Sequence, residues 1–208
     1  MIKVIITAIF TAVVTSVFWI WFYGWIGYGP SGPELATAGN VVTAQTPADT
    51  KVAIAQAVEV GPAGLAIPVA GVKASQLVDT FDAARSQGRR HDAIDIMANE
   101  GTPVISSADG TVEKLFNSVR GGMTIYVRSR DQHWVYYYAH LSGYAPGLHE
   151  GQQVRQGQVI ARVGHTGDAN AAGPHLHFAI NQMAPGERWW NGTAINPYPL
   201  LAGKKTNG

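Results

Sequence analysis

The stretch Gly173-Pro174-His175-Leu176-His177-Phe178 sets two imidazoles two residues apart among residues that favour β-strands. Alternate side chains of a strand point to the same face, so His175 and His177 face one site. Converging neutral imidazoles are a common way for a protein to hold zinc, and a third histidine with a carboxylate would complete a catalytic coordination sphere. The upstream segment Arg90-His91-Asp92-Ala93-Ile94-Asp95 offers both.

Composition limits what else the chain can be. Its 208 residues suffice for one domain of ordinary size with a core, plus a segment or two outside it. The charge balance of 15 Lys+Arg against 14 Asp+Glu gives +1, and without a basic run we expect no nucleic-acid partner. The absence of cysteine excludes disulfides and thiolate metal sites, which leaves histidine and carboxylate as the metal ligands.

The N-terminus carries a long apolar run. Val4 to Tyr28 contains no charged residue, and about 25 residues at ~1.5 Å each suffice to cross a membrane core of about 30 Å. Residues 1–28 are therefore predicted to form a transmembrane anchor helix. A buried core helix is usually shorter and has a polar stripe, and a signal peptide cleaved near Ala36-Thr37-Ala38 usually has a shorter apolar region.

The charge and aromatic residues flanking this run predict its orientation. Trp and Tyr residues crowd its C-terminal half, and Lys3 lies at the other end. This pattern favours a single pass through the inner (cytoplasmic) membrane, with the rest of the chain on the periplasmic or extracytoplasmic side. Residues 29–65 are rich in Gly, Pro, Ala and Thr and are expected to be a flexible linker. The globular domain is predicted over residues 66–202, with a tail at 203–208.

The domain is predicted to be mainly antiparallel β. Short runs of β-branched and aromatic residues are separated by glycine turns, and they cover 111–116, 124–130, 134–140, 158–163 and 175–181. The spacing of Leu77, Val78 and Phe81 predicts one helix over Ser75 to Arg85. Residues 100–104 (Glu-Gly-Thr-Pro-Val) are echoed by residues 150–154 (Glu-Gly-Gln-Gln-Val), as expected if two related β motifs pack face to face.

His91 and Asp95 require a bend between them. In a fully extended strand their Cα atoms would lie roughly 13 Å apart, too far to hold one ion. A loop that enters a strand near Asp95 solves this, and with His177 these residues give three ligands and leave a fourth position for water. On its own, His-x-x-x-Asp is more often a solvated surface pair; beside His-Leu-His in a chain without cysteine it favours a metal site.

Another histidine ends the run Tyr136-Tyr137-Tyr138-Ala139-His140. In a regular strand His140 shares a face with Tyr136 and Tyr138, so one face of this strand lines a cleft and the other the core. A surface position at a strand end is the plainer alternative. The remaining histidines lie beside Gly, Asp or Glu in expected turns and are interpreted as solvated: His133, His149 and His165.

These residues together resemble the zinc endopeptidases of the lysostaphin and LytM family, which cut peptide bonds in bacterial cell-wall peptidoglycan. The resemblance covers roughly residues 66–201 and consists of four motifs in order: His91-x-x-x-Asp95, Tyr138-Ala139-His140-Leu141, Gly164-His165-Thr166-Gly167 and the His175–His177 stretch. It implies a mostly antiparallel β domain with one groove along its sheet. One departure is Ala93, where many relatives carry glycine; the added methyl group removes no ligand.

The resemblance also implies roles for the site residues. His91, Asp95 and His177 would bind Zn²⁺, while His140 and His175 would be unligated catalytic histidines acting on a peptidoglycan peptide. His175 is assigned as the base and His140 as the oxyanion stabiliser or proton donor. Two other classes are weighed. Non-catalytic activators of other wall hydrolases have lost metal ligands that this chain retains, and a barrel-sandwich carrier related to lipoyl domains needs no histidine cluster.

Overall fold

A computed structural model describes residues 57–84 and 88–203. The predicted anchor at residues 1–28, most of the linker, and residues 204–208 of the tail lie outside the described residues. Within the described residues, no helix is long and apolar enough to span a membrane.

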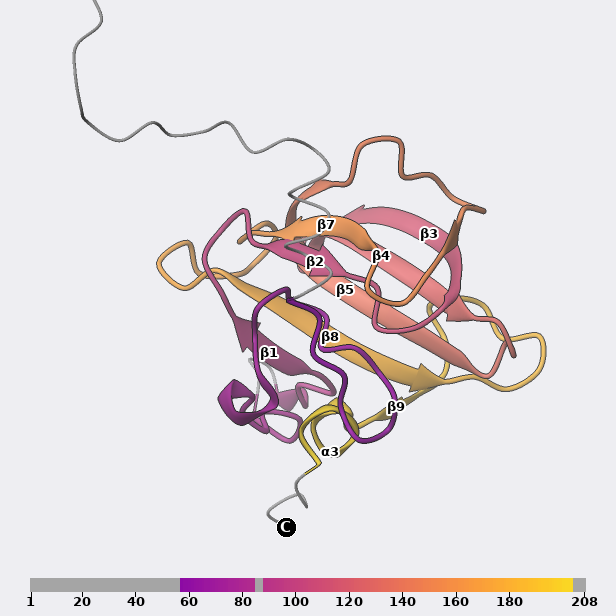
Figure 1. Cartoon of the computed structure of the whole chain (residues 1–208), viewed down its shortest axis with the longest axis horizontal. Coiled ribbons are helices and arrows are strands. Elements are labelled where there is room, and N and C mark those ends of the chain that lie inside the picture. Colours follow the sequence, from indigo (N-terminus) through magenta and orange to yellow (C-terminus); the bar gives the residue numbers. More distant parts are fainter. Residues whose placement is uncertain (1–56, 85–87, 204–208) are drawn as a thin grey trace, which may run out of the picture. The chain divides into compact units, whose positions relative to one another are not determined.

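The described chain forms a nine-stranded antiparallel sheet (Figure 1). Its main path runs β1-β8-β5-β4-β3-β6. In chain order the strands are β1 (Ile94–Met97), β2 (Pro103–Ile105), β3 (Gly110–Ser118), β4 (Gly122–Ser129), β5 (Trp134–Tyr144), β6 (Gln153–Val154), β7 (Val159–Val163), β8 (His175–Gln182) and β9 (Thr193–Ile195). The predicted β class is confirmed.

β5 is the central strand, and its two ends pair with different strands. Up to Ala139 it lies between β4 and β8. From Leu141 onward β7 takes the place of β8, while β4 still pairs with β5 at Leu141. The register shifts on both sides of this switch, so the switch coincides with a β-bulge at residue 140. β2 pairs with β7 across the same end of the molecule.

The internal echo in the sequence is visible in the fold. β2 pairs with β7, and β6 pairs with β3, so each echoed segment begins a β-turn-β motif that pairs with the other motif. Gly101 and Gly151 both have φ of +83°. The Gly101 nitrogen donates to the Val163 carbonyl at 2.8 Å, and the Gly151 nitrogen donates to the Val112 carbonyl at the same distance. The two motifs therefore pair edge to edge through strand hydrogen bonds, whereas the sequence predicted that they pack face to face.

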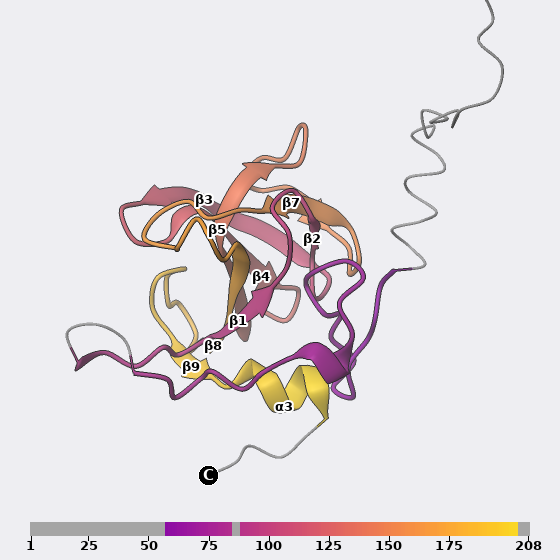
Figure 2. The same cartoon turned by 90° about the vertical axis from the view of Figure 1, so that its left-hand side faces the viewer.

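Hydrophobic side chains from one face of the sheet form the core. Leu176, Phe178 and Ile180 of β8 are fully buried together with Tyr138 of β5, whose ring lies 5.3 Å from that of Phe178. The helix α3 (Pro197–Ala202) adds Leu201 to this core. It lies against the β8 side of the sheet (Figure 2). The opposite face of β8 carries His175 and His177.

The predicted helix over Ser75–Arg85 is wrong in the part that the structure describes. Only the 3₁₀ turn η1 (Ala74–Gln76) forms there. Asp79 accepts hydrogen bonds from the Phe81 nitrogen and from Asn196, and the Thr80 hydroxyl accepts from the Asp95 nitrogen. These polar side chains compete with helical hydrogen bonds. The one described α-helix is α3, which Asn196 caps at its N-terminus.

The folded part begins before residue 66. Residues 57–65, assigned to the linker from the sequence, make backbone hydrogen bonds to the domain: Ile67 N donates to Glu59 O, and Gly71 N donates to Ala57 O. Gly61 packs so closely on the backbone of Leu201 that a Cβ there would overlap it.

Candidate active site

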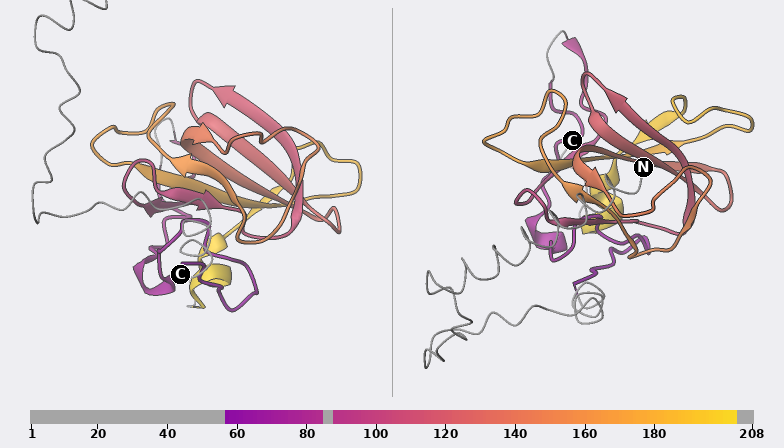
Figure 3. Two further views of the ribbon diagram at one scale, coloured as in Figure 1. Left: turned by 45° about the horizontal axis from the view of Figure 1, so that its top comes forward. Right: turned by 90° about the horizontal axis from the view of Figure 1, so that it is seen from above.

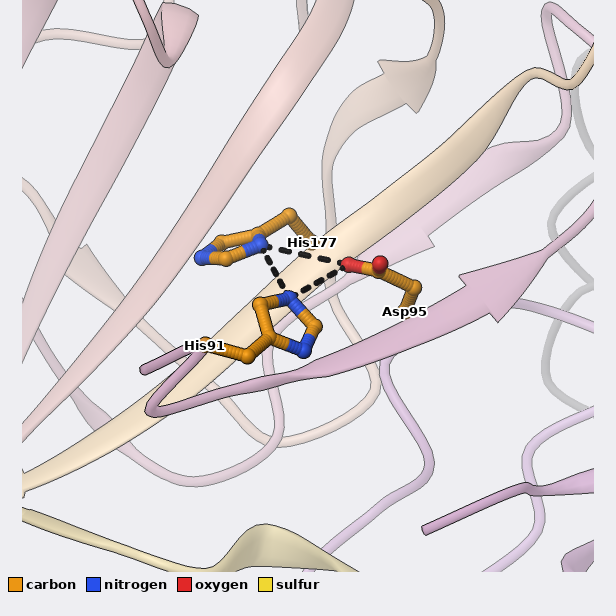
Figure 4. A group of neighbouring side chains, drawn as sticks. All are labelled: His91, Asp95 and His177. Carbon is orange, nitrogen blue, oxygen red and sulfur yellow. Dashed lines mark hydrogen bonds and ion pairs between the residues drawn. The ribbon is translucent and has the colours of Figure 1, made fainter. Parts of the chain in front are cut away.

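Three side chains that the sequence singled out meet at one point (Figure 4). Asp95 of β1 lies directly opposite His177 of β8 in the strand register. His91 precedes β1, and Asp92 has a φ of +55°, which supplies the expected bend. His91 Nε2 lies 2.9 Å from both Asp95 Oδ1 and His177 Nδ1, and the last two atoms are 3.2 Å apart.

These three atoms suit a zinc ion. Ligands at the usual zinc distances of about 2.0–2.2 Å in a tetrahedral arrangement are separated by roughly 3.3 Å, close to the spacing here. The donor set of two imidazoles and one carboxylate leaves a fourth position, as in catalytic rather than structural sites. Ala93, the departure from the family pattern noted above, is fully buried, and the three ligand atoms still lie within 3.2 Å of one another.

A hydrogen bond prepares His91 for this role. Its Nδ1 lies 2.8 Å from the Thr80 carbonyl oxygen. A carbonyl oxygen only accepts hydrogen bonds, so Nδ1 carries the proton and Nε2 presents its lone pair to the cluster. Burial lowers the pKa of His177, with the neighbouring histidines contributing and Asp95 opposing. Burial and the neighbouring histidines thus favour the neutral form of His177, which is the form that binds a metal.

His140 reaches the same site by an irregularity in β5. Its φ is +60°, rare for a residue other than glycine, and the bulge there breaks the alternation of side chains. Tyr136 and Tyr138 point into the core, whereas Tyr137, Ala139 and His140 all line the cleft. The expectation that His140 shares a face with Tyr136 and Tyr138 is therefore wrong, although its expected place at the cleft is confirmed.

His140 and His175 face each other across the cleft. Their ring centroids lie 5.0 Å apart, and the His140 ring is 5.6 Å from that of His177. His140 Nδ1 donates to the Thr166 carbonyl at 2.8 Å, and His175 Nδ1 donates to the Gly173 carbonyl at 2.9 Å. In the neutral form of each ring, Nε2 is therefore the free acceptor. Burial also lowers the pKa of His140, which keeps this ring neutral near pH 7.

The five side chains lie in or beside a cleft of about 650 Å³. Its rim includes Arg90, Arg120 and Asp168. The carbonyl groups of Thr80, Thr166 and Gly173, which fix three histidine tautomers, were not identified from the sequence, because backbone groups carry no residue signature. Two of these residues lie in motifs quoted from the sequence: Thr166 in Gly-His-Thr-Gly, and Gly173 at the start of the stretch with His175 and His177.

The remaining histidines lie outside the cluster. The side chain of His133 is 67% exposed beside Asp131, and His149 is exposed in a turn. His165 is half-buried, with Nδ1 at 3.2 Å from Glu100. The interpretation as solvated residues is confirmed for His133 and His149, whereas the His165 side chain is only 39% exposed.

Known proteins share both sequence and fold with this chain. The model of peptidase family M23 matches residues 89–197. An L-Ala–D-Glu endopeptidase of Bacillus subtilis is 37% identical over 58% of this chain and 37% of its own length. The glycyl-glycine endopeptidase ALE-1 of Staphylococcus capitis is 36% identical over 55% of this chain and 30% of its own. The chain thus spans less than two fifths of these curated relatives.

Solved structures agree. The catalytic domain of the antimicrobial peptidase lysostaphin from Staphylococcus simulans superposes with a TM-score of 0.50 at 28% identity, covering 59% of this chain and 89% of that domain. A putative glycyl-glycine endopeptidase lytM from Ruminococcus gnavus gives 0.52 at 30% identity, covering 61% and 52%. The family match spans more than half of the chain and includes all five clustered side chains, so the chain belongs to peptidase family M23, with relatives of the lysostaphin and LytM type.

Proposed function

We propose that the folded domain is a zinc-dependent endopeptidase that hydrolyses peptide cross-links of bacterial peptidoglycan. The observation that carries the proposal is the convergence of His91, Asp95 and His177 within 2.9–3.2 Å of one another, with two unligated histidines facing the same cleft. The relatives named above are peptidases and endopeptidases, which supports the same reaction class.

His91, Asp95 and His177 would hold the zinc. When bound, the ion supplies a Lewis acid for the scissile carbonyl and lowers the pKa of a water molecule toward neutrality. His175 accepts the proton of the attacking water at Nε2, because its Nδ1–H is held by the Gly173 carbonyl. His140 then stabilises the oxyanion or protonates the leaving amine. Because Thr166 holds its Nδ1–H, it donates only from Nε2, and the proton for Nε2 is the one that His175, across the cleft, takes from the water.

The test combines metal analysis with digestion of purified sacculi by the full-length chain. We expect about one zinc per chain and soluble peptides whose masses identify the bond that is cut. His177→Ala should lose zinc and activity together. His133→Ala is the matched control, since this exposed histidine lies outside the cluster and should leave both unchanged. Full zinc content in His177→Ala, or intact sacculi with the zinc-loaded chain, would contradict the proposal.

The second candidate, a non-catalytic activator, has no observation in its favour, because every clustered side chain is present.

We also propose that residues 1–28 anchor the domain to the inner membrane on its extracytoplasmic side. This rests on the uncharged run from Val4 to Tyr28. Protease added to spheroplasts should then remove the domain, and release of the chain from membranes by salt alone would refute the anchor.

A further inference from the structure

A chain of aromatic rings leads out of the cleft. Tyr137 lines the cleft, and its ring lies 5.8 Å from His177. The Tyr126 ring lies tilted against Tyr137 at 4.6 Å, and the Trp189 ring lies tilted against Tyr126 at 4.6 Å. Trp190 meets Trp189 edge to face at 4.9 Å. Phe116 adds to the outer end, 5.4 Å from Trp189. We call these five residues (Phe116, Tyr126, Tyr137, Trp189 and Trp190) the aromatic strip.

The outer end of the strip is open to solvent. Trp190 is 55% exposed and Phe116 41% exposed. They are the only aromatic residues among the large hydrophobic side chains exposed in the described part of the chain. Exposed aromatic rings that touch one another are typical of binding surfaces rather than of ordinary surface residues. The exposed end of the aromatic strip is therefore a candidate binding surface.

The loop that carries the two tryptophans is held in place. It joins β8 to β9 and extends beyond the strands in both views of Figure 3. Arg128 donates from Nη2 to the Glu187 carbonyl at 2.9 Å and is fixed by two hydrogen bonds to Glu113. The Ala184 nitrogen donates to the Glu187 carboxylate at 2.7 Å. The rings are thus presented in a preformed arrangement, which lowers the entropic cost of binding.

We propose that the aromatic strip is a subsite for the glycan strand of peptidoglycan, an inference that rests on the proposed function. Pyranose rings expose C–H groups on one face that stack on flat aromatic rings, while their hydroxyl and acetamido groups need polar partners. Asn191 follows Trp190 in the same loop, and the Arg188 guanidinium lies over the Trp190 ring, 5.2 Å from its centroid. The surface thus combines stacking faces with donors and acceptors.

The distance from the zinc site to the strip and the charge around the strip favour a glycan strand as the ligand. The four ring-to-ring steps from His177 to Trp190 cover no more than about six residues of extended peptide. Peptidoglycan stems are short peptides attached to the glycan, so a stem cut at the zinc site brings its sugar to the strip. An anionic membrane surface attracts clusters of cations, whereas Arg188 here is accompanied by Glu187.

The test measures glycan binding separately from hydrolysis. In the full-length chain carrying His177→Ala, we measure binding of peptide-free glycan strands by co-sedimentation and of chitotetraose by titration calorimetry. Adding Trp190→Ala should weaken binding about fivefold or more, and Trp190→Phe should retain most of it because the flat face remains. Val60→Ala is the matched control, because Val60 is 53% exposed and lies outside the strip.

Hydrolysis gives the second readout. With His177 intact, Trp190→Ala should raise the KM for sacculi while cross-linked peptides freed of glycan are cut at the unmodified rate. Equal glycan binding by Trp190→Ala and the parent overturns the subsite. The subsite is also overturned if Trp190→Ala leaves glycan binding unchanged but abolishes binding of the chain to anionic lipid vesicles or its dimerisation. If the parent cuts neither substrate, the proposed function fails; the binding measurement still decides the subsite.

Discussion

The five site residues divide by how closely their ligand atoms approach one another. One atom each of His91, Asp95 and His177 lies within 3.2 Å of the other two. His175 Nε2 stays 3.7 Å from Asp95 Oδ1, and the His140 ring lies 5.6 Å from that of His177. The first group suits metal binding, and the second suits proton transfer. This division follows from the distances between these atoms and agrees with the roles that the family resemblance implies.

The division predicts different losses for the two groups. His175→Ala and His140→Ala should each retain zinc and reduce the digestion rate about a hundredfold to ten-thousandfold, the usual loss for a general acid or base. Zinc stoichiometry and sacculus digestion are measured on the same preparations. If either variant loses its zinc, that histidine is a ligand. If both digest at near the unmodified rate, the proton-transfer roles are wrong even where the zinc site is right.

The sequence predicted most of these residues for identifiable reasons. His175 and His177 followed from the two-residue period of a strand, and the bend before Asp95 followed from its separation from His91. The orientation of His140 did not follow. Positive φ there occurs without a glycine, and only the switch of β5 from β8 to β7 produces it. Such bulges are set by tertiary pairing, so no local pattern reveals them.

Among the elements, the β3–β4 turn and the loop before β8 support each other next to the site. Asp168 N donates to the Arg120 carbonyl, and Met123 N donates to the Thr166 hydroxyl. The Thr166 hydroxyl in turn donates to the Leu141 carbonyl, beside His140. This contact fixes the Thr166 carbonyl that holds the His140 ring. The position of a catalytic histidine thus depends on two loops pressed together.

Gly167 tests that contact. Its φ is +80°, and a Cβ there would overlap the Arg120 carbonyl oxygen and the Gly122 nitrogen. Gly167→Ala should lower the free energy of unfolding by about 2–5 kcal/mol, combining left-handed strain with overpacking, and should reduce activity. Gly186→Ala is matched in φ, at +83°, with open space around it. This control should cost only about 1–2 kcal/mol in chemical denaturation; equal losses would show that the loop contact carries no strain.

The elements differ in how much of them the sequence predicted. The five long strands were found because their β-branched and aromatic runs are bounded by glycine turns. The helix was placed at Ser75–Arg85 because three apolar residues had helical spacing, yet Asp79 and Thr80 form side-chain hydrogen bonds there instead. α3 spans six residues, too short for a periodic signal, although its Asn196 cap, Pro197 and Gly203 at φ +68° mark both ends.

At the scale of the whole molecule, the two faces of the sheet around β5 have different roles. The face of the sheet toward α3 buries Tyr138 and Phe178, while the opposite face stays open for the cleft. The pair of echoed motifs, β2–β3 and β6–β7, closes the end where β5 changes partners. A sheet with one apolar and one polar face thereby supports a rigid site, which catalysis requires of its scaffold.

This burial of tyrosine predicts how the fold responds to alkaline pH. Burial raises the pKa of Tyr136 to about 12, and it also raises the pKa of Tyr137 and Tyr138. In the unfolded chain a tyrosine ionises near pH 10. Below that pH both states are protonated and stability is unaffected. Between about pH 10 and 12 the unfolded state loses protons that the folded state keeps, so stability must fall as the pH rises.

The expected loss is at most about 1.4 kcal/mol per pH unit for each such tyrosine, an upper limit because solvent screens part of the effect. Chemical denaturation at intervals from pH 8 to 11.5 measures it, and absorbance of the phenolate near 295 nm shows when the rings ionise. Tyr136→Phe removes one ionising group and should give a shallower decline above pH 10 than the parent chain. Parallel declines for the two chains, or phenolate absorbance that rises fully near pH 10 while the protein is still folded, would show that these rings are not shielded from water as the core requires.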